Sequence, residues 1–191
     1  MRAHAAGFTV VELLVGSMLS LALLTALTGA IGTGGRVLTA LGRRGEIEDT
    51  AHVALEALAF DVRRAGWDPA AAGVEALSDA RPARLTVQAD LDGDGIVDAS
   101  SEETVTYVCN LAGQKLSRVV GRQSLPLADT VTACAFRYLD ATGAVLPAPA
   151  AGLPAADRRR VRAVLLDFGL APNGPGAPTA RTAMVTLRTA P

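Results

Sequence analysis

An apolar run that begins directly after a single acidic residue constrains this chain most strongly. Residues 13–35 follow Glu12 and carry no charged side chain. The run exceeds the roughly 20 residues that a helix needs to cross a bilayer. A carboxylate in or beside hydrocarbon costs about 2.5–3.5 kcal/mol on insertion scales, so a carboxylate in this position is expected to have a partner and a function. We therefore predict a transmembrane helix and treat Glu12 as a candidate functional residue.

The residues around this glutamate resemble a processing motif. The segment GFTVVEL at residues 7–13 resembles the cleavage and methylation motif of type IV prepilins and of the pseudopilins of type II secretion. The resemblance implies that a prepilin peptidase cuts after Gly7, methylates the new N-terminus at Phe8 and releases residues 1–7. It also implies that Glu12 acts in filament assembly. An ordinary secretory signal would instead need an apolar region before the cut.

The motif also implies an orientation in the membrane. A peptidase of this kind works with the N-terminus on the cytoplasmic side, which places the head of the protein in the periplasm. The positive-inside rule points the other way, because only Arg2 precedes the apolar run and three arginines, Arg36, Arg43 and Arg44, follow it. We give the cleavage motif precedence and expect a single-pass inner-membrane protein. A plain membrane anchor that keeps residues 1–7 is the alternative.

The helix is predicted to continue beyond the membrane. Apolar residues recur with the 3.6-residue spacing of a helix that buries one face, at Leu55, Leu58, Ala59 and Val62. Gly66 and Pro69 then end the helix, so we expect it to run from Phe8 to Ala65. The chain divides into a leader at 1–7, a transmembrane or filament-core helix at 8–35, the second half of that helix at 36–66 and a head domain at 67–191.

The sequence after Pro69 changes from helical to alternating periodicity. The segments that alternate and are rich in Val, Thr, Leu, Phe and Tyr are 84–89, 104–109, 130–139, 161–170 and 182–188. A turn at 140–143 leads to a short partner strand at 144–146. A long helix followed by strands predicts an α+β protein whose head is an antiparallel β-sheet packed on the helix. The N-terminal motif implies the same arrangement, which is the pilin fold.

The end of the long helix carries a second resemblance. The segment DVRRAGW at residues 61–67 resembles the corresponding helix end in PilW-type minor pilins and GspJ-type pseudopilins. This resemblance implies a low-copy subunit that helps to start filament assembly at the tip. Its partners would be other minor pilins or pseudopilins, the major pilin, the prepilin peptidase and inner-membrane lipid.

Cys109 and Cys134 are the two cysteines of the chain. Both lie in predicted strands, where neighbouring Cβ atoms come within bonding distance, and a periplasmic head would lie in an oxidising compartment. We therefore predict a disulfide. The alternative is a pair of buried free thiols that behave as small apolar side chains.

An acidic loop at residues 90–98 is a candidate metal site. Asp90, Asp92, Asp94 and Asp98 share a short stretch with Gly95 at its sixth position, as in EF-hand calcium loops. The twelfth position is Ser101 instead of the bidentate glutamate of an EF-hand, and predicted strands flank the loop in place of helices. Structural calcium on the four aspartates is one hypothesis. A solvated hairpin turn is the other, because Asp-Gly pairs favour turns.

Charge and motif content argue against several other functions. The formal net charge is −1, and the arginines are scattered, so we predict no nucleic-acid partner. The run at 158–160, preceded by Asp157, is interpreted as a solvated edge. His52 is the one histidine beyond the leader, and HExxH and GxSxG motifs are absent. We predict no enzymatic activity, no catalytic residue and no required cofactor.

The sequence therefore predicts a minor pilin or pseudopilin, a structural subunit that is cleaved and then assembled through its N-terminal helix into a type IV pilus-like filament. A calcium-dependent binding or adhesive module at a filament tip is the alternative from another functional class.

Overall fold

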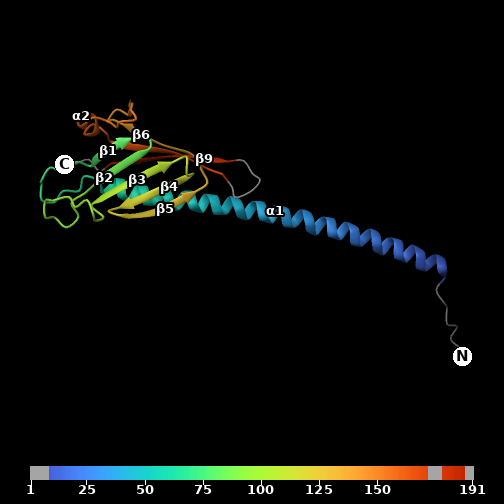
Figure 1. The fold of residues 1–191 in the computed structure, drawn as a ribbon. Coiled ribbons are helices and arrows are strands. Elements are labelled where there is room, and N and C mark those ends of the chain that lie inside the picture. The colour runs from blue at the N-terminus through green and yellow to red at the C-terminus, as the bar shows by residue number, and fades with distance from the viewer. Residues whose placement is uncertain (1–8, 172–177, 188–191) are drawn as a thin grey trace. The chain divides into compact units, whose positions relative to one another are not determined.

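The first helix of the structure follows the predicted range closely. The computed structural model describes residues 9–171 and 178–187, and the side chains of 29–41, 43 and 44 lie outside that description. Helix α1 spans Val10–Arg64 (Figure 1). Gly66 takes a φ of 75°, a left-handed conformation that glycine adopts easily and that stops a helix, as predicted. The chain divides within α1 into two compact units, Met1–Arg44 and Gly45–Pro191.

The first unit contains a helix segment that is apolar on all sides. Val10–Thr28 has a mean hydropathy of 2.1, and none of it is buried within the chain, so by length and composition it is able to cross a membrane. Its hydroxyl groups are satisfied locally. Ser20 and Thr28, for example, donate to carbonyls of the preceding turn at 2.8 and 3.0 Å, so their polar groups need no water within hydrocarbon.

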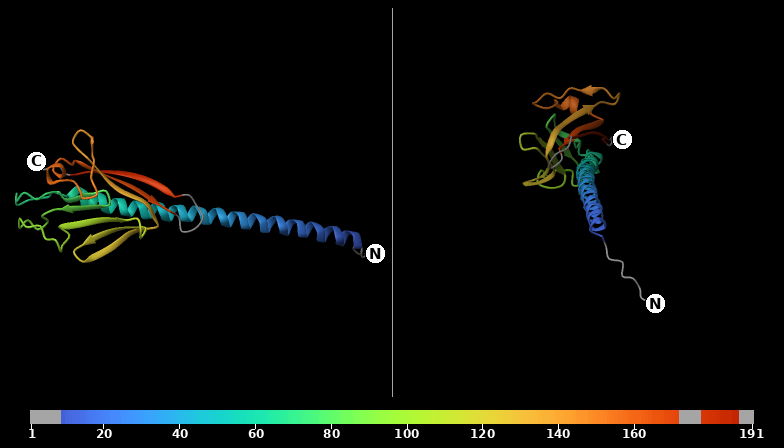
Figure 2. Two further views of the ribbon diagram at one scale, coloured as in Figure 1. Left: turned by 45° about the horizontal axis from the view of Figure 1, so that its top comes forward. Right: turned by 90° about the vertical axis from the view of Figure 1, so that its right-hand side faces the viewer.

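In the second unit, residues 45–64 of α1 bury one face against the strands. Of the predicted positions, Leu58 and Val62 are fully buried and Leu55 and Ala59 are partly buried. Ala51 and Ala54 extend the buried face toward the N-terminus, and Ala65 follows it directly after the helix. Small alanines allow the helix to approach the sheets closely, and Leu58 and Val62 fill the core with the largest buried aromatics, Tyr107, Tyr138, Phe136 and Phe168. This part of α1 runs alongside the strands in both views of Figure 2.

The strands form two antiparallel sheets. The first has the order β1-β2-β3-β4-β5, with β1 Leu77–Arg81, β2 Arg84–Gln88, β3 Thr104–Asn110, β4 Lys115–Val120 and β5 Gln123–Asp129. The second has the order β7-β6-β8-β9, with β6 Val131–Leu139, β7 Val145–Leu146, β8 Ala163–Leu170 and β9 Thr179–Thr186. A one-turn helix, α2 at Ala155–Arg158, precedes β8.

The α+β class is confirmed, but the head has two sheets where we predicted one. Thr130 takes a φ of 60° between β5 and β6, so the chain changes direction and β6 pairs with β7 and β8 instead of with β5. Strands were predicted at the positions of β2, β3, β6, β7, β8 and β9. The sequence analysis missed β1, β4 and β5.

The predicted disulfide is present and connects the two sheets. Cys109 lies in β3 and Cys134 in β6, with their Cα atoms 5.6 Å apart. We expected the two cysteines in neighbouring strands, whereas they come from strands of different sheets that face each other. A crosslink over 25 residues contributes roughly 3.5 kcal/mol in the chain-entropy model, and here it holds one layer of the head to the other.

A buried carboxylate attaches α1 to the first sheet. Asp61 is fully buried and accepts a hydrogen bond from the Tyr107 hydroxyl at 2.6 Å. Arg118 of β4 donates to the same oxygen at 2.7 Å, and Arg64 lies 2.9 Å from the other oxygen. Glu102 pairs with both arginines. Burial and the neighbouring Asp61 charge raise the pKa of Tyr107, so its hydroxyl keeps its proton and donates.

We predict that Asp61→Ala destabilises the head by about 3–5 kcal/mol, because it leaves the buried ends of Arg118 and Tyr107 without their shared acceptor. Urea unfolding of the full chain in detergent micelles measures the loss. Glu48→Ala is the matched control, since Glu48 pairs with Arg181 on the surface at 2.9 Å and its loss costs no more than about 1 kcal/mol. Equal effects of the two substitutions would contradict the anchoring role of Asp61.

Candidate functional site

Glu12 lies in the first turn of α1, where Thr9 caps the helix. The N–H of Glu12 donates to Thr9 Oγ1 at 3.3 Å. The spacing of the two residues is that of a capping box, and a carboxylate in the first turn interacts favourably with the helix dipole by about 0.3–1 kcal/mol. This is less than the cost of about 2.5–3.5 kcal/mol for a carboxylate in hydrocarbon. The helix dipole therefore offsets part of the cost of the Glu12 carboxylate, and among the described residues no cationic side chain forms an ion pair that would offset the remainder.

The capping arrangement was missed by the sequence analysis, although the T-x-x-E spacing of Thr9 and Glu12 is a signal for it. Gly7 and Phe8, where we predict cleavage and N-methylation, lie outside the described residues. Processing at these two positions stays a prediction.

The acidic loop closes a hairpin between β2 and β3. Its base is formed by Ala89 and Glu103, whose backbone groups are joined by a hydrogen bond of 2.9 Å. Asp90 donates its N–H to the Trp67 carbonyl at 2.8 Å, which ties the loop to the segment after α1. Gly93 and Gly95 both take a φ of 81°, a conformation that favours glycine and that turns the loop back on itself.

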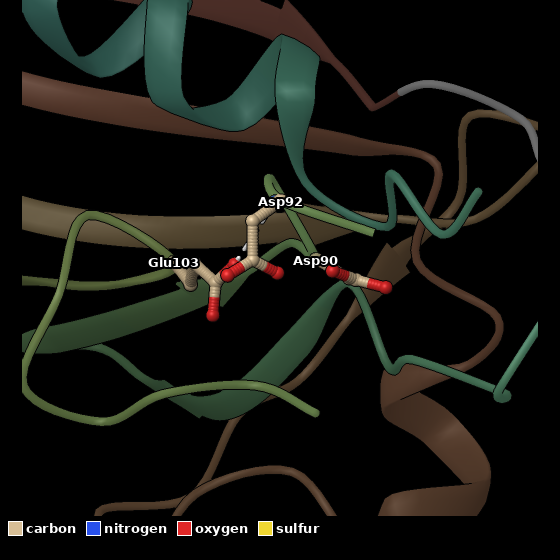
Figure 3. Close-up of side chains that lie close together, drawn as sticks. All are labelled: Asp90, Asp92 and Glu103. Atoms are coloured by element: carbon tan, nitrogen blue, oxygen red, sulfur yellow. Dashed lines mark hydrogen bonds between the residues drawn. The ribbon is translucent and has the colours of Figure 1, made fainter. Parts of the chain in front are cut away.

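Three carboxylates converge at the base of this loop. Asp90, Asp92 and Glu103 each offer an oxygen atom, and these atoms lie within 4.8 Å of one another (Figure 3). Asp90 follows β2 and Glu103 precedes β3, so the pairing of the two strands brings them together. Asp90 and Glu103 are buried, whereas Asp92 is exposed. We refer to these three residues as the acidic trio.

Backbone N–H groups already hold the two buried members of the trio. Glu103 accepts from Leu91 at 2.8 Å and from Asp98 at 2.8 Å, and these bonds, that from Asp98 foremost, lower the pKa of Glu103. Asp90 accepts from Gly93 at 2.7 Å and from Gly95 at 3.0 Å. Glu103 Oε1 also accepts from the Asp92 N–H at 3.3 Å, so both lone pairs of that oxygen are engaged. Glu103 Oε2 and the two Asp90 oxygens each retain a second lone pair for another donor or a cation.

The other two predicted metal ligands are not part of the trio. Asp94 accepts from the Ile96 N–H at 2.7 Å, and Asp98 accepts from the Ser100 N–H and hydroxyl at 3.0 and 2.9 Å. Both make local turns at the loop surface. Glu103, which lies two positions after the twelfth residue of the loop, is the third carboxylate that lies close to Asp90 and Asp92.

The donor set of the trio suits a hard cation in part. Among the described ion pairs, none joins an arginine or lysine to Asp90, Asp92 or Glu103, so three negative charges share one place without a cationic side chain. Calcium takes 6–8 oxygen ligands at 2.3–2.6 Å, so backbone carbonyls or water would have to complete the shell. A bound ion would neutralise charge that the backbone N–H groups only partly offset.

Comparison with known proteins identifies no relative. A scan against protein-family models and a search of the curated proteins found no match to this chain.

We predict that millimolar calcium raises the melting temperature of the full chain relative to EDTA, and that Asp92→Asn removes this rise. Asp94→Asn is the matched control, because it makes the same change two residues away and outside the trio. A calcium effect that Asp92→Asn leaves intact, or that Asp94→Asn abolishes equally, would contradict the acidic trio as ligand set. Identical melting curves with and without calcium would show that the loop is an ordinary hydrogen-bonded turn.

Proposed function

We propose that this chain is a minor pilin or pseudopilin. The observation that carries the proposal is the position of Glu12, in the first turn of a helix whose next residues, up to Thr28, are apolar on all sides. The Gly7 and Phe8 cleavage motif directly precedes this turn. An α+β head with antiparallel sheets packed on residues 45–64 of the same helix is compatible with a pilin head.

The proposed life of the subunit begins in the inner membrane, with the head in the periplasm. The prepilin peptidase removes residues 1–7 and methylates Phe8, and the mature helix then leaves the lipid and packs among the helices of other subunits. These partners are the major pilin and other minor pilins or pseudopilins, at the tip that starts assembly. The disulfide between Cys109 and Cys134 agrees with an oxidising compartment.

Glu12 guides assembly in this proposal. Cleavage after Gly7 creates a charged amine on Phe8, and N-methylation keeps that charge. When the amine of an incoming subunit meets Glu12 of a docked subunit, each charge removes the desolvation cost of the other. The attraction is several-fold stronger in hydrocarbon than in water, so it is strong enough to fix the register between neighbouring helices.

Two alternatives make different predictions. A plain membrane anchor would retain residues 1–7, so the mass of the mature N-terminus distinguishes it from a pilin. A calcium-dependent adhesive module at a filament tip would use the acidic trio, whose geometry is the observation in its favour. Within the pilin proposal itself, a GspJ-type pseudopilin and a PilW-type minor pilin share the same processing and the same use of Glu12.

We predict that Gly7→Val blocks cleavage, because a β-branched side chain replaces a residue without a Cβ at the cut site. Uncut precursor then accumulates in the inner membrane, as measured by mass spectrometry of the N-terminus. Ala5→Val is the control, since it places the same β-branched side chain two residues before Gly7 and is expected to leave processing intact. Release of protein that begins at Phe8 from the Gly7→Val strain would show that the cleavage assignment is wrong.

We predict that Glu12→Gln prevents incorporation into filaments while cleavage, membrane insertion and head folding stay normal. Glutamine also serves in a capping box, so this substitution removes the charge and keeps the cap. Thr9→Val makes the converse change, since it removes the cap and keeps the charge, and we expect it to assemble. The ratio of the chain in sheared filaments to that in the membrane pool measures both effects. Normal assembly of Glu12→Gln would reject the charge-pairing role.

A further inference from the structure

A cationic pocket lies beside the C-terminal end of α1, apart from the residues discussed so far. Its volume is about 510 Å³, within the roughly 300–1,000 Å³ typical of ligand sites. Residues 73–77, Arg158, Arg159 and Arg162 line it, together with Gly66, Val161 and Leu187. We call this feature the arginine pocket.

Arg158 is a fixed part of the wall. Its Nε donates to the Leu77 carbonyl at 3.0 Å and its Nη1 to the Leu153 carbonyl at 3.1 Å, while Nη2 reaches Glu75 at 3.2 Å. Only 20% of its side chain is exposed. The interpretation of 158–160 as a solvated edge is therefore wrong for Arg158, because main-chain carbonyls from two segments hold its guanidinium in place.

Glu75 is the one carboxylate in the lining. Its Oε1 accepts from both Nε and Nη2 of Arg159, at 3.0 and 2.8 Å, so two guanidinium donors converge on one carboxylate oxygen while Oε2 accepts from Arg158. The hydrogen bonds from Arg159 and Arg158 lower the pKa of Glu75. Arg159 is itself 72% exposed, so its guanidinium faces the solvent at the pocket mouth while one side is engaged.

Positive charge exceeds negative charge in the lining. Arg162 is held through Nη1 by the carbonyls of Arg159 and Val161, at 2.8 and 2.9 Å, and among the described residues no carboxylate pairs with it. Three guanidinium groups therefore face one carboxylate. The neighbouring Asp68 is directed to its own loop, where it accepts from the N–H groups of Ala72, Gly73 and Val74.

The rest of the wall is apolar. Val74, Leu77, Val161 and Leu187 line the pocket beside the arginines. A fully matching ligand would thus combine a carboxylate for Arg159 and Arg162 with a short apolar group for these side chains. Elsewhere in the head several exposed arginines are paired with acids, as Arg137 is with Asp167 and Arg181 with Glu48.

We propose that the arginine pocket binds a peptide segment of a partner protein in which an acidic residue stands next to an apolar one. The acidic side chain takes the guanidinium donors of Arg159 and Arg162 that face the solvent, and the apolar neighbour packs on Val74 and Leu187. Glu75 shows how a carboxylate is held here, and it competes with the incoming one for Arg159. The proposal does not depend on the filament role of the chain.

The test is a fluorescence-polarisation titration of the full chain in detergent micelles with a labelled peptide of alternating Glu and Leu. The expected result is binding at low ionic strength that weakens by at least about tenfold with the matching Gln and Leu peptide, and equally in the double variant Arg159→Gln with Arg162→Gln. Glu75→Gln is expected to tighten binding severalfold, because it removes the competing charge. Far-ultraviolet circular dichroism establishes that each variant is folded.

Matched controls separate the pocket from general charge effects. Arg63→Gln with Arg122→Gln removes the same charge from exposed positions outside the pocket, and Glu56→Gln is the corresponding control for Glu75→Gln. Unchanged affinity in these controls supports the proposal. It is overturned if the two arginine pairs weaken binding equally, or if the charged and neutral peptides bind alike. Stronger binding of inorganic phosphate than of the peptide, measured by competition, would also overturn it in favour of a phosphate site.

Discussion

The head of this protein depends on one buried charge. Asp61 brings a carboxylate from α1 into the interior, where desolvation would cost several kcal/mol if the charge were unpaired. Arg118 and Tyr107 compensate for that cost only when β3 and β4 lie at the correct height along the helix. The apolar contacts of Leu58 and Val62 provide most of the attraction, but they are not directional. The carboxylate therefore fixes the helix register that packing alone would leave loose.

The same helix meets two different requirements along its length. Residues 45–64 need one apolar face, because the other faces contact solvent, and small alanines alternate there with charged side chains. Residues 10–28 are apolar on all sides, and none of this segment is buried among the described residues, so its surface is suited to lipid or to packing among other helices. Glu12 is the exception in that segment. The helix dipole offsets less than half of the cost of the Glu12 carboxylate in hydrocarbon, and the proposed pairing with the amine of another subunit would supply the remainder.

Some elements of this fold could be predicted from the local sequence, because the spacing of their apolar residues matches the period of a strand or a helix. Strands β2, β3 and β6 show alternation in their sequences, β8 is a nearly continuous apolar run that is mostly buried, and α1 keeps helical spacing up to Gly66. By contrast, β5 contains Pro126, which argues against a strand except at an edge, and edge position depends on strand order. The positions of β1 and β4 likewise follow from pairing with β2 and β3. The acidic trio shows the same limit, because Asp90 meets Glu103 only through the β2–β3 register.

Side-chain networks were the least predictable feature, and the choice of arginine explains why they exist. Lys115 is the lone lysine of the chain, whereas Arg118, Arg137 and Arg159 each engage a carboxylate with two nitrogen atoms. A guanidinium holds a fixed fork, so it orients the segment that carries it, which a lysine ammonium does not. In most of the head, arginines such as Arg118 and Arg137 bind carboxylates of the head itself. In the arginine pocket there are more guanidinium groups than carboxylates. The guanidinium donors that have no acidic partner there are the ones that the proposed peptide would bind.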